Sequence, residues 1–163
     1  MMRKFIIIII LFIGLWGCEK ERRARNPYLG EVPINLDVTE LDMLRYRLQS
    51  IGNSAFISQQ GLRGIFVTCY GEGRYLAWEA ACPNHSLDGC YSRLYSVKTP
   101  TEEANYELHD YTYVRCSCCH TVYSLTTGNP LVLGKIAKPY PLLNYNVTVS
   151  GTSGKYSLKI RNN

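Results

Sequence analysis

The sequence predicts an all-β domain of short antiparallel strands, arranged as a sandwich or a small barrel. Thirteen tyrosines occur together with 13 glycines and 7 prolines, a mixture of aromatic and turn residues that is typical of β-rich proteins. Apolar residues make up 46% of the chain and charged residues only 19%, so a packed core is expected rather than disorder. Short β-branched or aromatic runs also recur between turn signals, without an internal repeat.

The elements follow in order from residue 32, where 32–38 alternates apolar and polar residues with a period of two, as half-buried strands do. Thr39 and Asp42 have capping-box spacing, which leaves open a short helix or an irregular arm. Residues 98–110 are polar and acidic and predict an inserted loop or a long hairpin. Further strands are expected at 55–58, 65–70, 75–80, 91–97, 111–115, 121–125, 143–150 and 155–160.

The amino terminus has the pattern of an export signal. Residues 1–4 include the charged Arg3 and Lys4, and 5–16 are almost entirely apolar, a run too short to span a bilayer comfortably. The run ends in Leu15-Trp16-Gly17-Cys18 and resembles the lipobox of bacterial lipoproteins, although Trp16 is bulkier than usual. The alternative is an uncleaved signal anchor with a chance cysteine.

The lipobox resemblance implies cleavage before Cys18 and acylation of that residue. The chain then divides into a signal peptide (1–17), a lipidated cysteine with a charged, solvated tether (18–30) and a β domain (31–163). The expected location is a lipid anchor in the bacterial cell envelope, in the outer membrane on its periplasmic or surface face. Arg3 is followed by Lys4 rather than by a second arginine, so the signal resembles the type that exports unfolded chains.

The charge balance argues against a nucleic-acid partner. The formal charge of the whole chain is +5, but from Asn26 onward 12 basic residues are balanced by 11 acidic ones. No basic face is therefore expected on the domain.

Two Cys/His clusters follow predicted strands. Apart from Cys18, the cysteines are at 69, 82, 90, 116, 118 and 119, and His85 and His120 lie beside them. Cys82, His85, Cys116 and His120 offer two thiolates and two imidazoles. Such a set suits a tetrahedral zinc ion, or a [2Fe–2S] cluster with two Cys on one iron and two His on the other.

Residues 55–160 resemble the Rieske domain family. The stretch 81–85 (ACPNH) is similar to the family's Cys-x-His loop, and 116–123 (CSCCHTVY) to its Cys-Pro-Cys-His-Gly-Ser-x-Phe loop. Residues 125–147 resemble the third, proline-bearing loop and its following strand. The resemblance implies an antiparallel Rieske-like fold with the two Cys/His loops at one end.

Both histidines depart from the family spacing by one residue. One possibility is a one-residue bulge in each loop, which would restore His85 and His120 as ligands. The other keeps the register and places Asn84 and Cys119 at the ligand positions. Tyr123, aligned with the family's Phe, favours Cys119 as the alternative ligand.

The resemblance also implies a disulfide between the loops, with Cys118 at the family position and Cys90 as its partner. A simpler alternative is that the six cysteines form three disulfides in an oxidising compartment. Cys69 is expected to be a buried small hydrophobe or the partner of a loop cysteine. His109 falls in the polar insertion and is expected to be exposed.

The resemblance implies a lipid-anchored single-electron carrier with a [2Fe–2S] cluster and an unidentified redox or envelope protein partner. The alternative is a cluster-free lipoprotein of the same fold, stapled by disulfides, with a binding or structural role. The displaced histidines, the extra cysteines and the export signal favour this alternative, and zinc is a third choice. The chain carries no catalytic motif of the common hydrolase or nucleotide-binding types, so an enzyme is not expected.

Overall fold

The computed structural model describes residues 25–102, 111–152 and 154–162, and within them the chain is almost entirely β. One short helix, α2 (Glu40–Arg45), accompanies ten strands. The strands are β1 (Asn35–Val38), β2 (Ser54–Ile57), β3 (Ile65–Gly71), β4 (Arg74–Glu79), β5 (Leu94–Val97), β6 (Tyr113–Cys116), β7 (Val122–Ser124), β8 (Pro130–Val132), β9 (Asn144–Thr152) and β10 (Lys155–Arg161). The predicted all-β class is confirmed.

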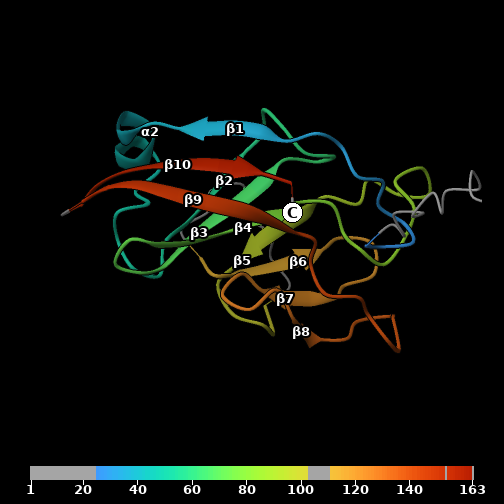
Figure 1. The fold of residues 1–163 in the computed structure, drawn as a ribbon. Coiled ribbons are helices and arrows are strands. Elements are labelled where there is room, and N and C mark those ends of the chain that lie inside the picture. Colours follow the sequence, from blue (N-terminus) through green and yellow to red (C-terminus); the bar gives the residue numbers. More distant parts are fainter. Residues whose placement is uncertain (1–24, 103–110, 153, 163) are drawn as a thin grey trace, which may run out of the picture.

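The strands form two antiparallel sheets (Figure 1). The larger has the order β1-β10-β9-β4-β3-β2, and the smaller has the order β5-β6-β7-β8. A single bridge between Ala81 and Arg93 continues the direction of β4 past its end and reaches the segment before β5. The first Cys/His loop therefore starts where the two sheets meet.

The hairpin of β3 and β4 supplies side chains to two separate cores. Ile65 and Val67 point into the core under the larger sheet, together with Ala77. Phe66 and Trp78 point the other way, into a second core shared with the smaller sheet. Burial on both faces explains why this part of the sequence is a nearly continuous apolar run.

Of the short helix and the irregular arm expected after Thr39, the structure has the helix, α2, and a capping box at its start. Thr39 Oγ1 accepts from the backbone N–H of Asp42, and the Asp42 carboxylate accepts from the backbone N–H of Thr39. The Asp42 carboxylate also accepts from the Thr39 hydroxyl at 2.7 Å, and this bond and the one from the Thr39 backbone N–H lower the pKa of Asp42 below its ordinary value. Met43 is the buried residue of the helix, whereas Leu41 and Leu44 are exposed.

Two strands differ from the sequence expectation. β5 begins at Leu94 rather than at 91, because the preceding residues belong to the first loop and its disulfide. β8 was not expected, because it has only three residues and begins with Pro130. A proline is tolerated there since β8 is the edge strand of its sheet.

Residues 25–30, expected as part of a solvated tether, pack on the domain instead. Leu29 is buried, and Asn26 is buried with its Nδ2 donating to the carbonyl of Pro83 at 2.9 Å. Arg25 donates to the carbonyl of Asn144 at 2.9 Å. The described part of the chain therefore begins beside the first Cys/His loop.

Several predictions fall outside the described residues. These are the signal peptide (1–17), Cys18 with the rest of the tether up to residue 24, and most of the polar insertion, including His109. Across the described parts of the chain, no helix has the length and apolar character needed to cross a membrane.

Candidate metal centre

The first loop leaves β4 and places Cys82 in the interior. The backbone N–H of Cys82 donates to the carbonyl of Ser92 at 2.7 Å, and that of Leu94 donates to the carbonyl of Ala80 at 2.8 Å. These two bonds hold both ends of the loop together. Cys82 is fully buried, while His85 three residues later is only partly so.

The second loop is a tight turn at the end of β6. The N–H of His120 donates to the carbonyl of Cys116 at 2.9 Å, and the N–H of Cys116 donates to the carbonyl of Thr121 at 3.0 Å. This turn buries Cys116 and Cys119, whereas Ser117 between them is exposed.

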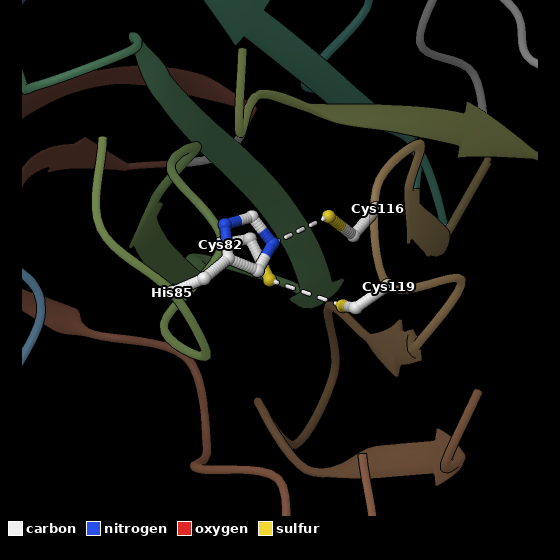
Figure 2. Close-up of side chains that lie close together, drawn as sticks. All are labelled: Cys82, His85, Cys116 and Cys119. Atoms are coloured by element: carbon white, nitrogen blue, oxygen red, sulfur yellow. Dashed lines mark hydrogen bonds between the residues drawn. The ribbon is translucent and has the colours of Figure 1, made fainter. Parts of the chain in front are cut away.

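The two loops bring together four potential metal ligands (Figure 2). The Sγ atoms of Cys82, Cys116 and Cys119 and a ring nitrogen of His85 all lie within 4.8 Å of one another. Cys82 Sγ lies 3.6 Å from Cys119 Sγ, and His85 Nε2 lies 3.2 Å from Cys116 Sγ. Three thiols and one imidazole are a donor set that holds tetrahedral zinc in proteins. The group could therefore hold a metal ion.

His120 does not join this group. Its backbone has a φ of 60°, and its Nδ1 lies 2.6 Å from a guanidinium nitrogen of Arg115. No bulge moves the second loop by one residue, so Cys119 occupies the place that the first alternative gave to His120. A positive φ of this kind is uncommon for a residue other than glycine.

Both candidate ligand residues of the first loop, Asn84 and His85, lie beside the thiols. His85 reaches the thiols, and its other ring nitrogen, Nδ1, is buried without a hydrogen-bond partner among the described residues. Asn84 is buried and donates from Nδ2 to the hydroxyl of Tyr123 at 2.7 Å. The same Nδ2 lies 3.3 Å from Thr121 Oγ1 and 3.8 Å from Cys119 Sγ. Asn84 thus binds the two loops to each other beside the thiols.

A third loop, within residues 125–147, packs against the second loop. The backbone N–H of Lys135 donates to the carbonyl of Cys119 at 2.7 Å, and Thr121 Oγ1 donates to the carbonyl of Leu133 at 2.8 Å. Gly134 has a φ of 63°, and a Cβ there would collide with the backbone of 119–121. The N–H of Tyr140 donates to Asn84 Oδ1 at 2.8 Å, so the third loop contacts both of the others.

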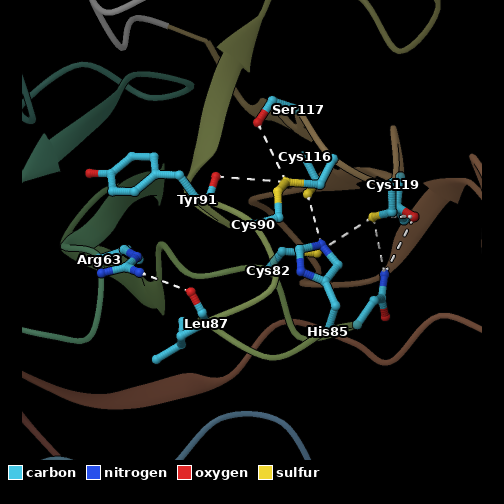
Figure 3. The surroundings of a disulfide bond; sticks show 12 residues. Arg63, Cys82, His85, Leu87, Cys90, Tyr91, Cys116, Ser117 and Cys119 are labelled. Carbon is cyan, nitrogen blue, oxygen red and sulfur yellow. Dashed lines mark hydrogen bonds between the residues drawn. A yellow bond between two sulfur atoms is a disulfide. The ribbon is translucent and has the colours of Figure 1, made fainter.

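The disulfide between Cys90 and Cys118 is present, as expected (Figure 3). The two Cα atoms are 6.5 Å apart, within the range that a disulfide spans. The other four cysteines of the described residues, at 69, 82, 116 and 119, are free, so the alternative of three disulfides does not describe this structure. Cys69 is buried in β3 under the larger sheet, which makes it the small hydrophobe of the two options.

The three thiols differ in acidity. The pKa of Cys119 is lowered, first by hydrogen bonding with Cys116 and Cys82 and then by Thr121. The pKa of Cys82 is raised by its hydrogen bonds with Cys116 and Cys119 and by burial. Of these two thiols, Cys119 is therefore the more acidic and Cys82 the less acidic.

Sequence reasoning missed the buried carboxylate of Glu79, which lies behind the first loop and accepts several hydrogen bonds. The Glu79 carboxylate accepts from the backbone N–H groups of Leu62, Arg63 and Ala81 at 2.8 to 3.0 Å, and from the Tyr145 hydroxyl at 2.6 Å. Burial raises the pKa of Tyr145 above its ordinary value, and the charge of Glu79 adds to this effect. The available signal was a single acid at the end of an apolar strand run.

No protein-family model matches the chain, and no curated protein or solved structure matches it.

Proposed function

We propose that this chain is a metal-binding domain of the bacterial cell envelope, anchored by lipid at Cys18. In this proposal Cys82, His85, Cys116 and Cys119 hold one zinc ion between the first and second loops. The protein then serves a binding or structural role at the membrane. The metal is the third choice among those that the sequence suggests, and the role is that of the second.

The compactness of the four ligand atoms carries the proposal. A tetrahedral ion with bonds of about 2.3 Å to sulfur separates its sulfur ligands by about 3.8 Å. Cys82 and Cys119 have their Sγ atoms 3.6 Å apart, and no two ligand atoms of the group are more than 4.8 Å apart. One ion at the centre therefore satisfies all four ligands with little movement.

The same distances suit a two-iron cluster less well. In the Rieske arrangement one iron takes two Cys and the other takes two His, so Cys82 and Cys116 belong on one side of the cluster. Besides the hydrogen bond between Cys82 and Cys116, short contacts join Cys82 to Cys119 and Cys116 to His85. Each of these short contacts pairs a residue expected on one iron with a residue expected on the other.

Zinc would act here as a cross-link. A site with four protein ligands leaves no open position for a substrate, and such sites contribute directly to folding. The ligands come from two loops that are otherwise joined by one disulfide and by Asn84. Binding of the metal would fix the loop end of the domain.

A [2Fe–2S] electron carrier of the Rieske type is the second candidate. The observation that favours it is the meeting of three loops in the order of that family, with a disulfide between the first two. The register that places Cys119 and His120 at the family's His and Gly positions supports it as well. When bound, such a cluster would transfer single electrons.

Metal content separates the two candidates. We expect the full chain, purified without oxygen, to contain one zinc per chain and to show no visible absorption. Two irons with acid-labile sulfide and a coloured spectrum would instead establish the electron carrier. A protein without either metal, with Cys82 joined to Cys119, would establish the cluster-free alternative.

Neighbouring substitutions test the ligand set. We expect Cys119→Ser to lose the metal, because it removes one of four ligands, and His120→Ala to retain it, because that ring contacts Arg115 instead. The measurement is the metal-to-protein ratio, determined by inductively coupled plasma mass spectrometry. The reverse pattern would restore His120 as a ligand and contradict the proposed site.

A further inference from the structure

We propose that the loop end of the domain lies against the surface of the lipid bilayer. The contact surface, called the loop face below, consists of Tyr28, Leu133, Lys135, Lys138 and Tyr140. The inference rests on the proposed lipid anchor at Cys18, but not on the identity of the metal.

The place where the chain joins the domain determines which end is held near the membrane. Arg25 donates to the backbone carbonyl and the side chain of Asn144 and forms an ion pair with Glu31. The next residue, Asn26, donates to Pro83 in the first Cys/His loop. The segment that comes from the anchor is thus fastened to the domain beside the metal ligands.

The connection from the anchor is short. Cys18 and Arg25 are seven residues apart in the sequence, which spans at most about 25 Å when fully extended. A domain of this size has a radius of gyration of about 14 Å, or a diameter of about 36 Å if spherical. The tether is therefore shorter than the domain, and the end that carries Arg25 is held closest to the bilayer.

The residues of the loop face belong to this same end. The rings of Tyr28 and Tyr140 are in edge contact, with centroids 6.1 Å apart. Tyr140 is also joined through its backbone to Asn84 of the first loop. Lys135 is joined through its backbone to Cys119 of the second loop. In Figure 1 the amino-terminal segment and the segment after β8 lie on the side away from α2.

The exposed side chains of the loop face suit lipid headgroups. Tyr28 and Tyr140 are 46% and 43% exposed, and Leu133 is 50% exposed. Tyrosine is enriched where proteins meet the membrane interface, because its ring is apolar and its hydroxyl polar. Residues 133–140 carry two exposed lysines and no acid, and lysines near an anionic membrane surface are attracted to it.

A second apolar surface lies at the other end of the domain. Leu41 and Leu44 of α2 are 73% and 54% exposed, and Ile51 is 66% exposed. This surface is more apolar than the loop face, but the described chain begins at the opposite end (Figure 1). It therefore provides a matched control for the membrane contact.

Tryptophan reporters on the full, acylated chain can test the orientation. Tyr140→Trp places a reporter on the loop face, and Leu44→Trp places one on α2. Each protein is reconstituted into phosphatidylethanolamine and phosphatidylglycerol vesicles that contain headgroup spin-labelled lipid. Trp78 is 8% exposed and gives the same background in both variants.

We expect the Tyr140→Trp reporter to lose most of its fluorescence and the Leu44→Trp reporter to lose none beyond the background. Lys135→Glu with Lys138→Glu should reduce this quenching, whereas Lys155→Glu with Lys159→Glu, the same charge change on β10, should not. Quenching of Leu44→Trp alone would overturn the orientation. Quenching of neither reporter would also overturn it and would leave the loop face to a protein partner.

The anchor and the metal are measured on the same samples. The mass of the mature protein reports acylation, and Cys18→Ser should release the protein from the vesicles. If the chain is acylated and loaded with metal but the reporters disagree with the expected pattern, the orientation fails while the proposed function stands. If Cys18→Ser stays bound at an unchanged mass, the anchor itself is wrong.

Discussion

The core under the larger sheet and the core behind the Cys/His loops are built in different ways. The first consists mostly of aliphatic side chains from successive strands, such as Ile65, Leu158 and Ile160. The second combines the aromatic rings of Phe66 and Tyr123 with three of the four potential metal ligands. Strand pairing arranges the first, whereas loops from distant parts of the chain must be held in place to form the second.

The forces that stabilise the two cores differ accordingly. Apolar packing is non-directional and adds up over area, so the first core tolerates small adjustments. The second depends on directional contacts, namely the Cys90–Cys118 disulfide, the hydrogen bonds of Asn84 and the group of thiols. We infer that the loop end is the part of the domain that depends on redox state and metal.

The largest expected effect is the loss of packing under the larger sheet. Leu158 is 1% exposed on β10, and Leu158→Ala should lower the free energy of unfolding by about 2–5 kcal/mol through lost burial and a residual cavity. Urea titration measures the change. The metal content of the folded protein should not change, and a loss of metal would mean that the two cores are not separate.

The next effect concerns the cross-link of the loops. Replacing both Cys90 and Cys118 by Ser should lower the free energy of unfolding by about 2–4 kcal/mol. Amide hydrogen exchange should rise first at the loops and only later in β9 and β10. Reductant should have the same effect on the wild type and none on the variant. Faster exchange in β9 and β10 than in the loops would contradict the proposed division.

The smallest change that compares the two cores is the removal of one tyrosine hydroxyl from each. Tyr145→Phe removes a donor to the Glu79 carboxylate and should cost about 1.5–3 kcal/mol, as bonds to charged groups do. Tyr123→Phe removes the acceptor of Asn84 Nδ2 and should cost about 0.5–1.5 kcal/mol, because Thr121 is a second partner. Urea titration of both variants shows which substitution lowers the free energy of unfolding more. A larger cost for Tyr123→Phe would show that the hydrogen bond between the uncharged Asn84 and Tyr123 contributes more than the bond to the Glu79 carboxylate.

The strands were predictable where sequence pattern and environment agree. The alternation around Leu36 and Val38, and the hairpin turn near Gly73, led to β1 and to the β3–β4 pair. β8 was not predictable, since three residues beginning with Pro130 carry too little pattern. Residues 25–30 were also misjudged, because burial of Leu29 depends on the loop that it contacts and not on its neighbours in sequence.

The candidate site was predictable in part. The Cys/His pattern of the sequence identified both loops. The resemblance to the Rieske family implied the Cys90–Cys118 disulfide and named Cys119 as the alternative to His120 in the ligand set. Spacing could not choose between them, because a bulge in the turn would move one residue into the place of the next. That choice depends on the positive φ of His120 and on its contact with Arg115, which are three-dimensional properties.

The pairing of β1 with β10 has a consequence for how the domain is completed. The first strand of the fold lies beside the last, with Asn35 opposite Arg161. During synthesis or export the amino-terminal strand emerges long before its partner exists, and the closure of such distant segments is slow. The larger sheet cannot reach its final form until nearly the whole chain is available. Until then β1 is an unpaired edge, which is the kind of surface that other chains or chaperones bind.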